Sequence, residues 1–227
     1  MPRVFVGLEL PASIKAQIAL AQGGVSNARW QRPDQLHLTL RFIGEVEDRM
    51  LFDIRSALAQ LRFHPVFIAL SGLGSFHKGG RPKALWAGIT PEDQLKALHN
   101  KIDYAITACG LPEEGRRFKP HVAIARFPSR GRIDTLEHVI VSQGGLTSPT
   151  FEIGHITLFR SVRTPNGSDY SVIDRFHGSG GFVDSPSNAY DEGPLWNEYQ
   201  TADHWVDEEM TGAGDPWFDV ASLPRYA

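Results

Sequence analysis

Residues 37–42 read HLTLRF and residues 121–127 read HVAIARF, and these two runs decide which fold the chain is expected to adopt. Side chains alternate between the two faces of a β-strand, so each run predicts a strand with one apolar face and one face headed by a histidine. The first run is expected to carry an imidazole, a hydroxyl and a cation on one side: His37, Thr39 and Arg41. In the second run His121 shares its side with Ala123 and Ala125, which leave a hollow beside the imidazole.

A third histidine heads a similar run, HITLFR at residues 155–160. Its neighbours on the same side of the expected strand are apolar: Phe151, Ile153 and Phe159. A histidine in such surroundings is more often a hydrogen-bonded structural residue than a catalytic one, so we predict a structural role for His155. The same structural interpretation stays open for His37 or His121 taken singly.

Two such histidines together, one in each half of the chain, indicate a shared chemistry. An imidazole titrates at about pH 6.5, so His37 and His121 can act as an acid and a base at neutral pH. The Thr39 hydroxyl is expected in the same cavity, where it can donate a hydrogen bond to a phosphate oxygen. No carboxylate cluster accompanies either histidine, so the sequence predicts no metal site. Neither a nucleophile elbow nor a Walker-type loop occurs.

Composition and charge restrict the class of protein. The 227 residues contain one cysteine, Cys109, which excludes an intramolecular disulfide. No stretch approaches the roughly 18 consecutive apolar residues of a membrane span, and the first residues do not resemble a secretory leader. We therefore expect a cytoplasmic protein that does not contact a membrane. Residues 1–176 carry a net charge of +6, which is typical of a protein that handles an anionic ligand.

Strand-like and helix-like segments alternate along residues 1–176. Period-two patterns predict strands at 3–10, 36–42, 65–76, 84–89, 121–126, 151–160 and 169–176. Helical periodicity and capping residues predict helices at 11–22, 48–61, from Thr90 to about Gly110, and 132–140. Each half thus supplies strands and helices around a histidine-headed strand. This arrangement indicates an α+β domain of two similar lobes.

The composition changes after Phe176, so we predict one domain at 1–176 and a C-terminal extension at 177–227. The extension has one arginine against ten acidic residues, a net charge of −9, and linker-like Gly, Ser and Pro. It also holds three tryptophans: Trp196, Trp205 and Trp217. Solvating acidic tails are poor in aromatic residues, so these rings are expected to dock on the body or on a partner.

The motifs around the two histidines resemble those of a known family. Trp30-x-Arg32-Pro33 followed by HLTLRFIG (37–44) resembles the first signature of the 2H phosphoesterases, and FKPHVAIAR (118–126) resembles the second. Their separation, the RPKALW run at 81–86 and ITLFRS at 156–161 are similar to the RNA 2′,3′-cyclic phosphodiesterases, also called the 2′-5′ RNA ligase-like family. The resemblance covers residues 1–176 and leaves the extension outside.

The resemblance implies a fold, a reaction and a set of residues. It implies two pseudo-symmetric lobes of antiparallel sheet with outer helices flanking a central cleft, in a monomer that needs neither metal nor cofactor. It implies the opening of RNA 2′,3′-cyclic phosphate ends to 2′-phosphates, with 2′-5′ RNA ligation as a side activity. By resemblance His37 is the proton donor to the leaving 3′ oxygen, His121 is the base, and Thr39 holds a non-bridging oxygen. Arg126 matches a phosphate-binding position, although strand alternation places it away from the His121 side.

One position departs from the family pattern. The family has threonine or serine where this chain has Ala123, so the second motif lacks its hydroxyl. Losing one preorganised donor costs on the order of 10²–10³ in rate at comparable sites. Arg126, Lys119 or a water molecule could compensate. The departure also keeps a second hypothesis open, in which the chain is a non-catalytic module that binds nucleotides or RNA ends.

Overall fold

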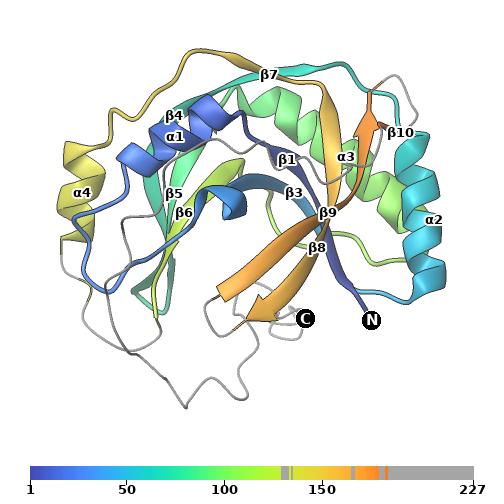
Figure 1. Cartoon of the computed structure of the whole chain (residues 1–227), viewed down its shortest axis with the longest axis horizontal. Helices are drawn as coiled ribbons and strands as arrows, with labels where there is room; N and C mark the ends of the chain where they lie inside the picture. Colours follow the sequence, from blue (N-terminus) through green and yellow to red (C-terminus); the bar gives the residue numbers. More distant parts are fainter. Residues whose placement is uncertain (129–132, 134, 165–166, 179–181, 184–227) are drawn as a thin grey trace, which may run out of the picture. The chain divides into compact units, whose positions relative to one another are not determined.

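The computed structural model describes residues 1–128, 133, 135–164, 167–178 and 182–183, and these form an α+β arrangement (Figure 1). The described strands make one sheet in the order β10-β9-β8-β1-β3-β6-β5-β4-β7, with β2 beside β6, and the pairings are antiparallel. The strands are β1 (Arg3–Glu9), β2 (Arg29–Trp30), β3 (His37–Glu45), β4 (Val66–Lys78), β5 (Arg81–Thr90), β6 (His121–Arg126), β7 (Phe151–Ile153), β8 (His155–Thr164), β9 (Gly167–His177) and β10 (Phe182–Val183). The predicted class is confirmed.

The two histidine strands lie side by side at the centre of this sheet. β3 pairs with β6 through Leu38 and Val122. The lobe on the β3 side consists of β1, β8, β9 and β10, and the lobe on the β6 side consists of β5, β4 and β7. The bonds between β3 and β6 are therefore the ones that join the two predicted lobes.

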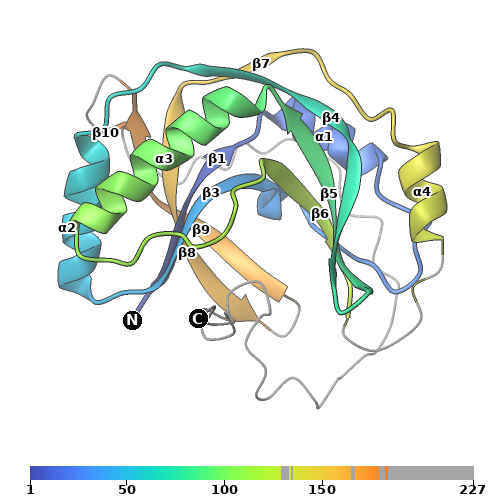
Figure 2. The ribbon, with the colours of Figure 1, turned by 180° about the vertical axis from the view of Figure 1, so that it is seen from behind.

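Helices cover the apolar face of each lobe (Figures 1 and 2). The described helices are α1 (Ala12–Leu20), α2 (Asp48–Ala59), α3 (Glu92–Ala108), α4 (Leu136–Ser142) and a single 3₁₀ turn, η1 (Pro33–Gln35). α2 is joined to β9 by an ion pair between Arg55 and Asp174 at 2.5 Å. α1 lies with the other lobe, where Gln17 donates a hydrogen bond to the Thr147 carbonyl. The core between helices and sheet includes Leu38, Ile54, Ile102 and Val122, all fully buried.

The predicted strand at 151–160 is wrong, because the chain changes lobes in the middle of it. β7 pairs with β4 at one edge of the sheet, whereas β8 pairs with β1 on the far side of the histidine strands. The break falls at Gly154, between the two strands. An apolar pattern with period two continues through the break because both segments bury one face. Pairing partners, which are distant in sequence, are needed to see that there are two strands.

The sheet also extends beyond the predicted domain boundary at Phe176. β9 continues to His177, and the short strand β10 pairs with β9 through Phe182 and Phe176. The Gly178 carbonyl accepts a hydrogen bond from the backbone N–H of Phe63 at 2.9 Å. The division into a body and an acidic extension stays a prediction, and the tryptophans of the extension lie outside the described residues.

Candidate active site

The predicted site residues lie on one face of the central strand pair. Leu38 pairs with Val122, so continuing this antiparallel register by one residue in each direction sets His37 opposite Ala123 and Thr39 opposite His121. Residues directly opposite each other share a face, so both imidazoles and the hydroxyl are on the same side. The opposite side carries Leu38 and Val122, which are fully buried under the helices. Each motif thus supplies a histidine that faces the other motif.

The two imidazoles are held in the same way. His37 Nδ1 lies 2.7 Å from the Gln35 carbonyl oxygen, and His121 Nδ1 lies 2.7 Å from the Lys119 carbonyl oxygen. A carbonyl can only accept, so in each ring Nδ1 carries the proton and Nε2 is the atom left for chemistry. His37 Nε2 is 3.1 Å from the Thr39 hydroxyl. The carbonyl two residues before each histidine therefore selects its neutral tautomer.

A β-bulge after each motif changes which residues reach the site. In β3, Gly7 pairs with Thr39 and Val6 with Arg41, so Leu40 is an extra residue. The expectation that Arg41 shares the His37 face is therefore wrong. The bulge turns Arg41 to the helix side, where it is 6% exposed and its Nε lies 2.6 Å from Asp103. A bulge inverts the alternation beyond it, and nothing in HLTLRF reveals this.

The equivalent bulge in β6 brings Arg126 to the site. On the neighbouring strand β5, Trp86 pairs with Ala123 and Leu85 with Ala125, so Ile124 is the extra residue. Simple alternation would send Arg126 away from His121, but the bulge returns it to the same side. Its positive charge acts on both His37 and His121. The structure therefore brings together His37, Thr39, His121 and Arg126, all four residues expected from the sequence.

Both histidines are poised in their neutral form. Burial lowers the pKa of His37 to about 4, against the raising effect of the Gln35 hydrogen bond, and the charges of Arg126, His121 and Lys15 lower it further. Burial also lowers the pKa of His121, and the charges of Lys119 and Arg126 act in the same direction. Burial is the main cause of both shifts, and the neighbouring cations that add to it would attract a bound anion. The charges around the pair therefore suit an anionic ligand.

Aromatic rings surround each imidazole, and the sequence patterns did not single them out. His37 contacts Phe5 and Tyr170, each at a ring-centroid distance of 4.8 Å. His121 contacts Phe76 edge to face at 4.8 Å and Trp86 at 6.2 Å. Alternation along β1, β4, β5 and β9 indicates which aromatic residues face the imidazoles only when the order of the strands in the sheet is known. Phe5 and Trp86 are buried, so only the half-buried rings of Phe76 and Tyr170 can offer a surface for stacking a nucleobase.

His155 lies on the same side of the sheet but belongs to a separate polar cluster. Its Nε2 lies 3.2 Å from the Glu9 carboxylate, which also accepts hydrogen bonds from Thr157 at 3.0 Å and from Arg175 at 2.5 Å. Burial alone would raise the pKa of Glu9, but the hydrogen bonds from Arg175 and His155 hold it well below its usual range. A carboxylate with three donors is a structural anchor between β1, β8 and β9. The predicted structural role for His155 is consistent with this position.

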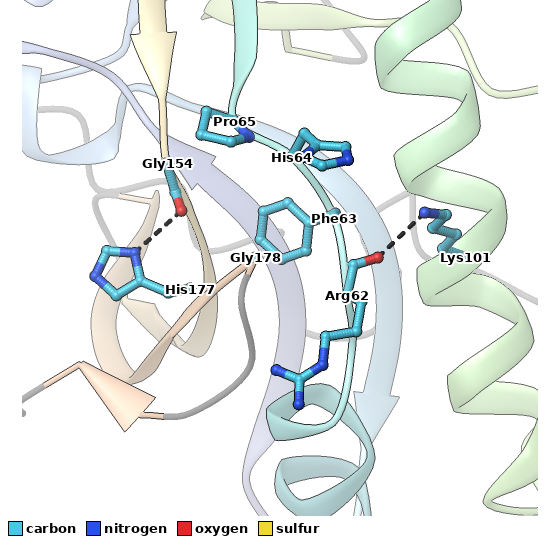
Figure 3. Close-up of a pocket in the computed structure, with 8 residues that line it drawn as sticks. All are labelled: Arg62, Phe63, His64, Pro65, Lys101, Gly154, His177 and Gly178. Carbon is cyan, nitrogen blue, oxygen red and sulfur yellow. Dashed lines mark hydrogen bonds between the residues drawn. The ribbon is translucent and has the colours of Figure 1, made fainter.

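A concavity of about 550 Å³ lies where β9 ends, away from the histidine pair (Figure 3). Its basic side chains do not meet at one point. The Lys101 ammonium donates to the Arg62 carbonyl at 3.1 Å, and His177 Nδ1 lies 3.1 Å from the Gly154 carbonyl oxygen. Figure 3 shows the Arg62 guanidinium directed away from Lys101. Among the described residues, no group of three or more His, Cys, Asp or Glu side chains could hold a metal ion.

The sequence matches one protein family over most of its length. The 2′-5′ RNA ligase superfamily matches residues 11–165. The chain belongs to this superfamily. The matched segment includes both histidine motifs and the strands β2 and β5 that pair with β6, whereas β1, which pairs with β3, precedes it.

Curated relatives are similar in sequence, and solved structures are similar in fold. The RNA 2′,3′-cyclic phosphodiesterase of Aeropyrum pernix is 30% identical, covering 62% of this chain and 80% of the relative. The enzyme of the same name from Archaeoglobus fulgidus is 28% identical, covering 77% and 99%. The fold is similar to TT0787 of Thermus thermophilus, with a TM-score of 0.63 at 24% identity, covering 78% of this chain and 98% of that one. It is also similar to Escherichia coli LigT complexed with 3′-AMP, with a TM-score of 0.61 at 22% identity, covering 78% and 98%.

None of the helices in the described part of the chain combines the length and the apolar character needed to cross a membrane.

Proposed function

We propose that this chain hydrolyses 2′,3′-cyclic phosphates at RNA ends to 2′-phosphates, with His37 as the general acid and His121 as the general base. The observation that carries the proposal is the pair of imidazoles on one face, each with Nδ1 held by a backbone carbonyl and Nε2 left for chemistry. Superfamily relatives named RNA 2′,3′-cyclic phosphodiesterase support the substrate class. The expected partners are RNA termini or cyclic nucleotides, and we expect a cytoplasmic monomer.

The reaction needs one proton taken up and one proton delivered. His121 Nε2 accepts a proton from water, whose oxygen attacks phosphorus. The bond between phosphorus and the 3′ oxygen breaks, and His37 Nε2 delivers a proton to that oxygen. The products are a 2′-phosphate and a 3′ hydroxyl. Arg126, whose charge reaches both imidazoles, stabilises the extra negative charge on the phosphorane.

His37 must gain a proton before it can act as the acid. The pKa of about 4 belongs to the protein without substrate, where the ring is buried and cations lie near it. A phosphodiester brings a negative charge to the same place, which raises the pKa of both histidines. The Thr39 hydroxyl, now 3.1 Å from His37 Nε2, can turn to donate to a non-bridging phosphate oxygen. Substrate binding therefore prepares the acid.

The direct test is turnover of 2′,3′-cyclic AMP, and of a short RNA with a cyclic end, in the presence of EDTA. We expect 2′-phosphate products, identified by phosphorus NMR. His37→Ala and His121→Ala should each reduce kcat by about 10²–10⁴. His155→Ala is the matched control, because it removes an imidazole from the same face without touching the pair, and it should retain activity. Loss of activity in a folded His155→Ala protein would contradict the assignment of His37 and His121 as the acid–base pair.

A second function is favoured by Ala123. The second motif lacks a hydroxyl donor, which is compatible with a module that binds nucleotides or RNA ends without cleaving them. The same assay separates the two functions. Tight binding of 2′-AMP with no turnover of any cyclic substrate would select the binding module.

A further inference from the structure

Ala123, which lacks the hydroxyl of the family position, lies between two residues that carry rings. Across the β3–β6 pair Ala123 faces His37, by continuation of the Leu38–Val122 register. Across the β5–β6 pair it faces Trp86. A row of neighbouring positions therefore runs from Trp86 through Ala123 to His37 on the catalytic face. A donor that replaces the hydroxyl must reach this row from a neighbouring element.

Trp86 is fixed in place by packing alone. It pairs with Gly74 on β4, and a Cβ atom at Gly74 would lie 2.3 Å from the nearest carbon atoms of the indole. Only glycine therefore lets the ring lie flat across β4. The indole Nε1 is buried and has no hydrogen-bond partner among the described residues, so no polar contact explains the position of the ring. The part of the indole that can bind a neighbouring group is therefore the face of the ring.

The Lys119 side chain lies over that face of Trp86. Its ammonium lies 4.4 Å from the centre of the Trp86 ring, within the range of a cation–π contact. The backbone of Lys119 is tied to the same motif, because its carbonyl accepts the hydrogen bond from His121 Nδ1. Pro120 follows directly and restricts Lys119 to extended backbone conformations. The Lys119 side chain is exposed, so its ammonium can reach a ligand. The cation–π contact positions the ammonium, and the hydrogen bond to His121 positions the backbone.

We propose that Lys119, held over Trp86, supplies the phosphate-binding donor that the second motif lacks at Ala123. The inference rests on the proposed function and names a further residue of the same site. An ammonium has three donors and a full charge, so it can stabilise the same developing oxyanion as a hydroxyl. Its charge already acts on His121. Lys119 thus serves the second motif as Thr39 serves the first.

The first test compares two lysine substitutions. Lys119→Met should lower kcat/KM for 2′,3′-cyclic AMP about tenfold or more. The loss should be smaller than the roughly 10²–10³ of a buried oxyanion donor, because Lys119 is exposed. Lys119→Arg should retain most activity. Lys96→Met, which removes an exposed lysine paired with Glu92 on α3, is the control and should match wild type. Equal activity of Lys119→Met and wild type would overturn the proposal.

The second test is a rescue. Ala123→Ser restores a hydroxyl at the family position, so it should raise the activity of Lys119→Met by a larger factor than it raises that of wild type. A structural role for Lys119 predicts no such rescue. Trp86→Leu removes the ring that holds the ammonium and should resemble Lys119→Met, while Trp86→Phe retains a weaker face and should lie between. Equal effects of Ala123→Ser in both backgrounds would count against the proposal.

A binding measurement keeps this inference separate from the proposed function. If wild type turns over no cyclic substrate, the hydrolase proposal fails, but Lys119 can still be judged. Titration with 2′-AMP, followed by NMR of the histidine side chains, should show weaker binding in Lys119→Met than in Lys96→Met. The pKa of His121 should also rise in Lys119→Met, because a positive neighbour is gone. Unchanged nucleotide affinity together with an unchanged His121 pKa would reject the role of Lys119.

Discussion

Each imidazole of the proposed acid–base pair depends on the carbonyl two residues before it. Gln35 and Lys119 accept from Nδ1 at the same 2.7 Å distance, so both rings present Nε2 in the neutral state. The carbonyl belongs to the backbone, so no side-chain substitution removes it directly. Changes near the motifs act on the site when they move this backbone. The residue-scale chemistry is therefore set by local chain geometry as well as by residue type.

We expect kcat/KM for a cyclic substrate to peak on the acid side of neutrality. The pair works when one imidazole is protonated and the other is neutral. In the free protein the pKa of His37 is about 4 and that of His121 lies below its ordinary value. The fraction of protein with one protonated and one neutral imidazole is largest between these two pKa values. Both lie below the ordinary imidazole value of about 6.5, so kcat/KM should fall as the pH rises above about 6.5.

The measurement is a pH profile of kcat/KM and of kcat on the same substrate. The kcat profile reports the complex, so it should lie at higher pH because the bound phosphate favours both imidazolium forms. A value of kcat/KM that stays constant from about pH 7 to about pH 9 would contradict the acid–base pair as described.

Helix α3 connects the two histidine motifs. His99 on α3 is buried, and its Nδ1 donates to the Leu40 carbonyl, which belongs to the bulged residue of β3, at 2.7 Å. The same ring stacks on Phe118, with centroids 4.3 Å apart and planes within 3°. Phe118 begins the segment that leads into His121. The buried His99 side chain thus contacts both the bulge after the first motif and the segment that leads into the second.

We expect His99→Phe to reduce both stability and activity. The substitution retains an aromatic ring for Phe118 but leaves the buried Leu40 carbonyl without its donor, which costs about 1–3 kcal/mol of unfolding free energy. Denaturant unfolding measures this loss. His138→Phe, at an exposed position on α4, is the matched control and should stay within about 0.5 kcal/mol of wild type. Activity should fall through kcat, since His99 is remote from substrate.

The alternative is that His99 only fills the core. NMR shifts of His37 and His121 distinguish the two roles, because a positioning residue changes both motifs at once. Unaltered shifts of both imidazoles in His99→Phe would show that the connection through α3 does not position them.

At the scale of the whole molecule, the two lobes are interleaved along the chain. β1 lies in one lobe and β2 in the other, β3 returns to the first lobe, and β4, β5, β6 and β7 lie in the second, until the chain returns to the first lobe at Gly154, where β7 ends and β8 begins. Neither lobe is therefore a continuous segment of sequence. The lobes have to fold together, since the lobe on the β3 side takes strands from the beginning and the end of the domain and the strands β4, β5, β6 and β7 of the other lobe lie between them in the sequence. The histidine strands at their junction depend on both.

Truncation tests where the domain ends. A chain of residues 1–185 should fold and retain activity, because it keeps β9, β10 and the bond between the Phe63 N–H and the Gly178 carbonyl. A chain ending at Phe176 loses β10 and the hydrogen bond between Phe63 and Gly178, so it should unfold at a lower denaturant concentration. Circular dichroism during denaturation compares the two. Equal stability of both truncated chains would support the boundary at Phe176 drawn from composition.

Much of the site could be predicted from local pattern. The alternation around His37 and His121 is sufficient to place both imidazoles on strand faces opposite an apolar core, and the helices follow from periodicity and caps. The short motifs indicate Thr39 as well. These inferences succeed because they concern residues one or two positions apart, where backbone geometry alone decides which side a residue takes.

The sequence by itself determined the residue types of the site, the lobe-like alternation of strands and helices, and the absence of a hydroxyl at Ala123. Tertiary structure alone decided that Arg41 turns away, that Arg126 turns in, and that Trp86 lies beside Ala123 under Lys119. Both arginine positions depend on bulges, which appear only when a strand is matched against its partner. The Trp86 position depends on Gly74, a residue on another strand. Pairing between distant segments supplies this information, because a bulge and a cross-strand neighbour are properties of two strands and cannot be read from one.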